Sequence, residues 1–151
     1  MIPTPHQLGL PERAKVYLAG PMRAKPRFNF PAFMQATKLL SESGWDVFNP
    51  AQRDVDAGFD PGLALHRQKI EFNLEDAMRA DLQWIVDKAQ ALIVLDGYHG
   101  SIGAMHELRT ARIIGLPTYH FYSSGLAELR VTLSTQHATI VEDEIIKGVR
   151  P

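Results

Sequence analysis

The run Ala91–Leu95 (ALIVL) constrains the fold most, because all of its side chains are apolar. A strand of this kind is buried on both faces, as in a parallel sheet that is covered by helices. Weaker strand patterns at 15–19, 45–48, 117–121 and 138–141 alternate with helix patterns at 31–43, 73–88 and 107–114. The alternation predicts an α/β fold with a doubly wound, flavodoxin- or Rossmann-like parallel sheet of four to five strands and helices on both faces.

The length of 151 residues corresponds to a single domain. Residues 1–14 are rich in proline and lack periodicity, so we expect a loose N-terminal arm ahead of one domain at 15–151. The stretch 50–70 is rich in Asp, Gly and Pro and predicts a long loop, with or without a short helix. We expect residues 51–72 to form a mobile or locally helical cover over one end of a ligand cleft.

The composition excludes several classes of function. Without cysteine the chain has no disulfide, no thiolate metal site and no cysteine nucleophile, and a cytoplasmic location is the simplest expectation. The formal charge of −1 lacks the basic excess that a nucleic acid polymer needs. No apolar run approaches the ~20 residues of a membrane span. We therefore expect neither a nucleic acid nor a membrane partner.

Three loops that follow predicted strands are candidates for a ligand crevice, because open parallel sheets bind ligands at the carboxyl ends of their strands. These loops begin at Gly20, Asn49 and Asp96. The third loop runs through Gly100, Ser101 and Gly103 into a helix. Glycines and the free amides of a helix start favour an anion such as phosphate. A tight turn without any ligand explains the same glycines.

Three side chains near this crevice are candidates for chemistry. Glu107 lies about one turn inside the helix, where its side chain can lean back toward the crevice and the helix amides should keep it ionised. Asp81 lies within a helix pattern and Tyr17 on the first strand. Structural roles compete with each assignment: a surface pair for Glu107, a solvated acid for Asp81 and a core position for Tyr17.

No metal or other cofactor is predicted. The acidic stretch 54–65 lacks the glycine and glutamate that an EF-hand loop places at its sixth and twelfth positions. His99 and His106 have no third ligand at zinc spacing.

Four segments occur in an order that resembles the nucleoside 2-deoxyribosyltransferase-like superfamily. They are VYLAGP at 16–21, DLQWI at 81–85, SIGAMHE at 101–107 and GLP at 115–117. The resemblance spans about residues 15–121. It is closest to a branch common in phages and bacteria that is described as a domain of unknown function, which shares YLAGPM, NFPAF at 29–33 and Asn49-Pro50.

The resemblance implies roles for the three candidate side chains. Glu107 corresponds to the nucleophile, Asp81 to the residue that supports proton transfer or orients the sugar, and Tyr17 to the partner of the nucleophile. Relatives that hydrolyse deoxynucleoside 5′-monophosphates imply a phosphate site, which falls here on Gly20, Arg23, Ser101 and Gly103. Those hydrolases have a serine where this chain has Pro21, which cannot donate an N–H, so the need for a 5′-phosphate is open.

The resemblance therefore implies cleavage or transfer of an N-glycosidic bond in a (deoxy)nucleoside or nucleoside 5′-monophosphate, without a cofactor. It also implies a homodimer or a larger homo-oligomer. Asn49, Asp96 and Gly100 are further candidates for substrate contacts. Two alternatives stay open: a non-catalytic nucleotide-binding or sensing module, in which Glu107 binds ribose hydroxyls, and a phosphoribohydrolase-type N-glycosidase.

Overall fold

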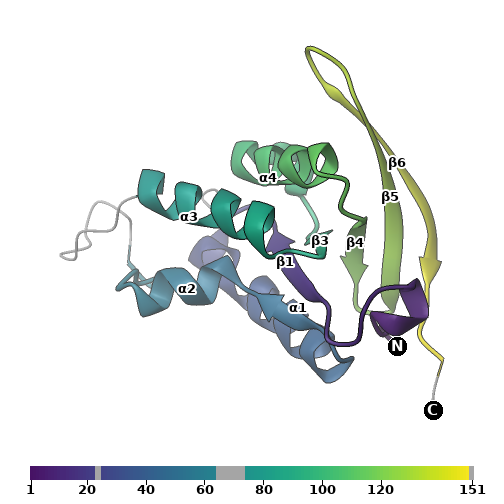
Figure 1. Ribbon diagram of the computed structural model, residues 1–151. Helices are drawn as coiled ribbons and strands as arrows, with labels where there is room; N and C mark the ends of the chain where they lie inside the picture. The colour runs from purple at the N-terminus through teal and green to yellow at the C-terminus, as the bar shows by residue number, and fades with distance from the viewer. Residues whose placement is uncertain (23–24, 64–73, 150–151) are drawn as a thin grey trace.

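The computed structural model describes residues 1–22, 25–63 and 74–149 and contains one mixed sheet of six strands (Figure 1). The strands are β1 (Lys15–Ala19), β2 (Asp46–Phe48), β3 (Ala91–Val94), β4 (Thr118–Tyr122), β5 (Gly125–Leu133) and β6 (Ala138–Ile146). Their order in the sheet is β2-β1-β3-β4-β5-β6. Pairing is parallel from β2 to β4 and antiparallel from β4 to β6.

The α/β class is confirmed, but the prediction of a wholly parallel sheet of four to five strands is wrong. The turn between β4 and β5 is too short for a crossover, so the chain returns antiparallel as a hairpin. β5 alternates buried and exposed residues over much of its length, and β6 is largely exposed. The expected strand at 138–141 is the beginning of β6, and β5 was not predicted.

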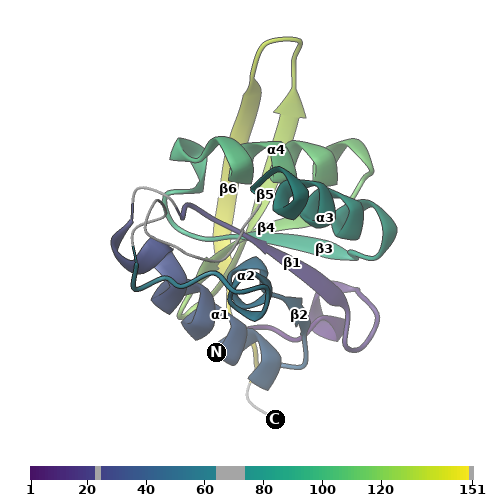
Figure 2. The same cartoon turned by 90° about the vertical axis from the view of Figure 1, so that its left-hand side faces the viewer.

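Helices cover both faces of the sheet, as expected (Figure 2). α1 (Phe30–Glu42) and α2 (Pro50–Asp56) lie on one face, and α3 (Leu74–Asp87) and α4 (Ile102–Ile113) lie side by side on the other. Short 3-10 turns at His6–Leu8, Pro26–Asn29 and Tyr98–Gly100 complete the described elements. No helix in the described part of the chain has the length and apolar character needed to cross a membrane.

The side chains of β1 alternate between two cores, because successive residues of a strand point to opposite faces. Val16 and Leu18 pack with α1, whereas Tyr17 and Ala19 pack with α3 and α4. All four are completely buried. The central strand therefore places the hydroxyl of Tyr17 under α3 and α4.

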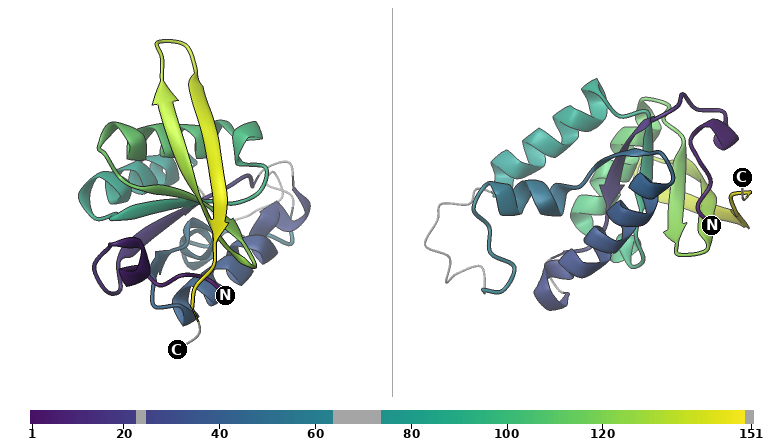
Figure 3. Two further views of the ribbon diagram at one scale, coloured as in Figure 1. Left: turned by 90° about the vertical axis from the view of Figure 1, so that its right-hand side faces the viewer. Right: turned by 90° about the horizontal axis from the view of Figure 1, so that it is seen from below.

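The N-terminal segment is packed against the domain rather than loose. Ile2 is only 4% exposed, and the indole Nε1 of Trp45 donates a hydrogen bond of 2.9 Å to the Pro3 carbonyl. The Gly148 amide donates to the Met1 carbonyl at 2.7 Å, so the two ends of the chain lie together (Figure 3). The burial of Ile2 and these two hydrogen bonds, which no periodicity signals, hold the segment in place.

Gly125 begins β5 at a point where two strands approach closely. A Cβ atom there would lie 2.2 Å from the Ile146 carbonyl oxygen, whereas one on Gly103 in α4 would meet no atom within 4 Å. We expect Gly125→Ala to lower the free energy of unfolding by about 1–3 kcal/mol. The control Gly103→Ala should leave it unchanged or raise it by up to ~1 kcal/mol. Denaturant unfolding measures both, and equal stabilities of the two variants would contradict the β5–β6 register.

Candidate active site

A cavity of about 570 Å³ lies between the end of β1, α2, α3 and the start of α4. Its polar lining includes three acids, Asp54, Asp81 and Glu107, together with Tyr17 and His106. The apolar lining includes Met22, Phe28, Phe33, Phe59 and Met78. The cavity thus combines a cluster of acids with a surface suited to a flat aromatic group.

Three elements bring Tyr17, Asp81 and Glu107 together. Tyr17 comes from β1, and its ring stacks on Phe48 of β2 with centroids 5.5 Å apart. Asp81 comes from α3 and Glu107 from α4, and these helices pack against each other. Tyr17 is completely buried and the two carboxyl residues are each 7% exposed. The three sequence-predicted residues therefore share one nearly dry site.

Burial raises the pKa of Glu107 well above its ordinary range, and the charge of Asp81 raises it further. Hydrogen bonding to Tyr17 and the charge of Arg53 act in the opposite direction without cancelling this shift. The expectation that helix amides keep Glu107 ionised is wrong. The amide field is concentrated in the first turn of a helix, and Glu107 lies beyond that turn of α4, where its side chain is buried.

Asp81 differs from Glu107 because a cation contacts it. The pKa of Asp81 is raised to about 6. Burial is the main cause of this rise, and the charge of Arg53 limits it. Arg53 Nη2 lies 2.9 Å from Asp81 Oδ1. Above this pKa Asp81 is ionised, whereas burial and the charge of Asp81 favour the protonated form of Glu107.

The Tyr17 hydroxyl lies between the two carboxyl groups. Hydrogen bonding with it lowers the pKa of both Asp81 and Glu107. Within the described residues, however, the hydroxyl has no partner at good hydrogen-bond angles. Burial raises the pKa of Tyr17 well above its ordinary value, so the phenol stays neutral. A neutral hydroxyl near two acids can both donate and accept a proton.

The predicted glycine-rich segments also reach the cavity. Gly20, Gly100, Ser101 and Gly103 all line it. A Cβ on Gly20 would lie 3.0 Å from the Leu95 Cβ, so a larger residue would crowd the end of β1. The Ser101 hydroxyl oxygen accepts a hydrogen bond of 3.2 Å from the Ala104 amide and caps α4. This cap gives Ser101 a structural role, and its hydroxyl proton stays available to a ligand.

Two predicted residues do not line the cavity. The side-chain oxygen of Asn49 caps α2, accepting from the Ala51 amide at 2.9 Å. Asp96 Oδ1 lies 2.8 Å from His120 Nε2.

Arg23 lies outside the described residues, as do residues 64–72 of the expected cover. The described part of that cover contains α2 and the cavity residue Phe59.

Sequence reasoning missed three contributors to the site. Arg53 and Asp54 belong to α2, and no local pattern marks either as a site residue. Phe28 was also missed. It has a left-handed backbone with φ 55°, which is unusual for a bulky residue, and its ring packs edge-on against Phe59 at 4.9 Å. Strain of this kind often accompanies ligand sites.

A separate polar cluster surrounds His120. Its ring nitrogens lie 2.8 Å from Asp96 Oδ1 and 3.1 Å from Glu142 Oε2, and the Tyr122 hydroxyl donates to Glu142. These groups satisfy one another. Over the residues that the structure describes, no group of three or more His, Cys, Asp or Glu side chains is arranged to hold a metal ion.

A protein-family model described as a domain of unknown function (DUF4406) matches residues 14–120, more than half of the chain. The chain belongs to the DUF4406 family. The matched region contains β1 to β3, helices α1 to α4 and the first three residues of β4. Tyr17, Asp81 and Glu107 all lie within it. Comparison with curated proteins gives no match.

The raised pKa of Glu107 makes this DUF4406 domain less stable as pH rises above the ordinary glutamate value of 4.5. The folded protein binds the Glu107 proton more tightly than the unfolded chain, so this contribution to stability is lost as pH rises above about 4.5. Glu107→Gln removes this effect. We expect the difference in Tm, variant minus parent, to increase from about pH 4.5 to about pH 8, with ~1 kcal/mol worth ~3 °C. Thermal unfolding across this range checks it, and a pH-independent difference would contradict the assignment.

Proposed function

We propose that this DUF4406 domain cleaves or transfers the N-glycosidic bond of a nucleoside or nucleoside 5′-monophosphate, with Glu107 as the nucleophile. The observation that carries the proposal is the convergence of Glu107, Asp81 and Tyr17 in one cavity that also has an aromatic lining. The sequence resemblance to nucleoside 2-deoxyribosyltransferases gives independent support.

The chemistry of the bond requires two acids with different roles. Breaking the bond between C1′ and the base nitrogen builds oxocarbenium character at C1′, which a carboxylate stabilises or captures as an ester. The departing base needs a proton. Two carboxyl groups whose environments separate their pKa values suit this division of labour.

In the proposed reaction, the proton of Glu107 first moves to Asp81. Tyr17 passes its hydroxyl proton to Asp81 and takes the proton of Glu107, which leaves a Glu107 carboxylate and a neutral Asp81. Glu107 then bonds to C1′ as the C1′–N bond breaks, and Asp81 protonates the base. Water or a second base attacks C1′, releases Glu107 and returns a proton to Asp81.

The cavity walls suggest how a substrate lies. The base would pack against Phe28, Phe33 and Phe59, which place C1′ near the acids. The 5′ end would point toward the turn at Gly100 and Gly103, where free amides of α4 favour negative charge. Pro21 also lines the cavity and offers no N–H, so a 5′-hydroxyl and a 5′-phosphate are both tested.

Release of free base from a panel of nucleosides and nucleoside 5′-monophosphates tests the proposal. We expect the parent to cleave at least one of them and Glu107→Gln to be slower by at least ~1000-fold, which corresponds to ~4 kcal/mol of transition-state stabilisation. Glu128→Gln, an exposed change on β5, is the matched control and should keep the parent rate. Glu107→Gln cleaving at the parent rate would exclude Glu107 as nucleophile, and tight binding without cleavage by the parent would favour a sensing module.

The proton path also predicts a pH dependence. Asp81 must be ionised to accept the Glu107 proton, and its pKa is about 6. We expect kcat to fall by about tenfold for each pH unit below that value. Steady-state rates from acidic to neutral pH, on the best substrate of the panel, check this. A kcat that stays constant down to about pH 4 would exclude Asp81 as the proton acceptor.

A further inference from the structure

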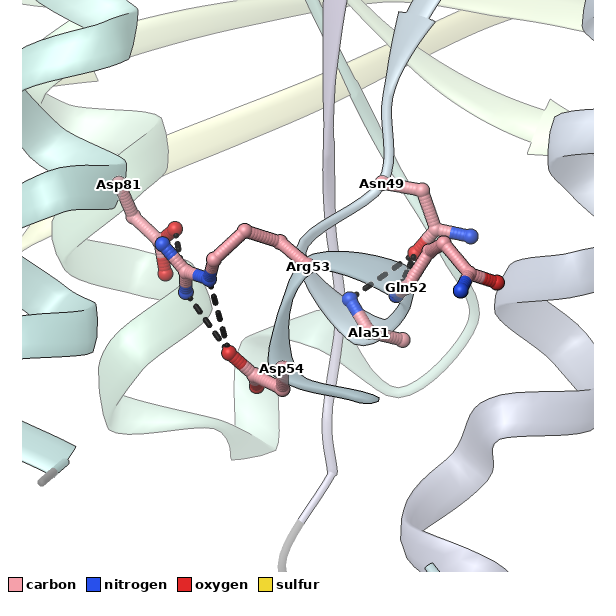
Figure 4. A network of polar contacts seen from close by, with 6 residues as sticks. All are labelled: Asn49, Ala51, Gln52, Arg53, Asp54 and Asp81. Carbon is pink, nitrogen blue, oxygen red and sulfur yellow. Dashed lines mark hydrogen bonds and ion pairs between the residues drawn. The ribbon is translucent and has the colours of Figure 1, made fainter. Parts of the chain in front are cut away.

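Arg53 is the residue of this site that neither the sequence motifs nor the proposed chemistry uses. It lies on α2, which follows β2 directly. The Asn49 side chain caps the start of α2, and the Arg53 amide donates to the Asn49 carbonyl at 3.1 Å (Figure 4). The end of a strand and a capped helix therefore fix the position of Arg53.

Two carboxyl groups surround the guanidinium of Arg53. Its Nη2 atom lies 2.8 Å from Asp54 Oδ1 and 2.9 Å from Asp81 Oδ1, and its Nε donates to Asp54 at 3.0 Å. Figure 4 shows the side chain reaching from α2 to Asp81 with Asp54 beside it. The two hydrogen bonds to Asp54 form a clamp, which keeps Nη2 in ion-pair contact with Asp81.

The charges around Asp81 make this contact important. The groups that face Asp81 are Tyr17 from β1, Asp54 from α2 and Glu107 from α4. His106 of α4 lines the same cavity. Of the described residues, Arg53 is the only cation that acts on Asp54, Asp81 and Glu107. Three buried acids thus share one positive charge. Arg53 contacts Asp54 and Asp81 directly, whereas its charge acts on Glu107 without such a contact.

We propose that Arg53 is a positioning residue which, held by Asp54, keeps the negative charge of the empty site on Asp81 and the proton on Glu107. The inference rests on the proposed function for its catalytic meaning, because the proton path needs this starting arrangement. Arg53 is not among the described residues that line the cavity, so it acts through Asp81 rather than on the substrate.

Thermal unfolding of the empty protein tests the inference without any substrate. Arg53→Met removes the charge and keeps much of the length, and Arg53→Lys keeps the charge. Arg130→Met, which breaks the exposed pair with Asp143, is the control. Without the charge of Arg53 the pKa of Asp81 in the folded protein should be higher. The variant should therefore lose more stability than the parent as pH rises.

We expect the Tm deficit of Arg53→Met relative to the parent to be at least about twice as large at about pH 8 as at about pH 5. Arg53→Lys should show a smaller pH-dependent deficit and Arg130→Met a constant one. In the Asp81→Asn protein, the Tm deficit caused by Arg53→Met should depend much less on pH. A constant deficit for Arg53→Met, or the same pH dependence without Asp81, would overturn the inference. If Arg53→Met does not fold, the Arg53→Lys comparison in the two backgrounds decides by the same criteria.

Turnover separates this inference from the proposed function. On a substrate that the parent cleaves, Arg53→Met should shift the fall of kcat at acidic pH to higher pH. Its KM should stay within about twofold of the parent value. A raised KM without this shift would contradict the role assigned to Arg53. The predicted Tm behaviour without cleavage of any nucleoside would reject the proposed function and leave the Arg53–Asp81 coupling standing.

Discussion

The site depends on one electrostatic constraint: Asp54, Asp81 and Glu107 lie buried beside a neutral phenol, with the charge of Arg53 between two of them. A buried carboxylate without a partner costs several kcal/mol, so such a group keeps its proton. Arg53 offsets this cost for Asp81 more directly than for Glu107. Asp81 and Glu107 differ in pKa because Arg53 of α2 contacts Asp81 and does not contact Glu107.

The fold supplies this arrangement through β1. Because the strand is central and buried on both faces, Tyr17 must project under α3 and α4, where it meets Asp81 and Glu107. The same acids make the folded state less stable at neutral pH than an apolar core would be. Sites that carry out chemistry commonly accept such a cost, because activity needs groups that stability alone would not favour.

The sequence predicts the parallel half of the sheet because its strands are short apolar runs separated by helical periodicity. β5 and the later part of β6 were not predicted, because Glu128, Arg130 and the acidic residues at 142–144 interrupt the apolar pattern of these strands. Tyr17, Asp81 and Glu107 were identified by motif resemblance, and they do meet. Arg53 could not be identified, because its role depends on a contact between α2 and α3 that no local pattern encodes.

Asp81 and Glu107 share one buried site, and ¹³C NMR titration of their side-chain carboxyls measures how the two groups affect each other. Asp81→Asn and Glu107→Gln assign the signals. We predict that Asp81 titrates near pH 6 and that Glu107 titrates well above 4.5. Asp81→Asn should lower the pKa of Glu107, because it removes a neighbouring negative charge. Titration of Asp81 and Glu107 near their ordinary values of 3.8 and 4.5, each unaffected by loss of the other, would contradict the account.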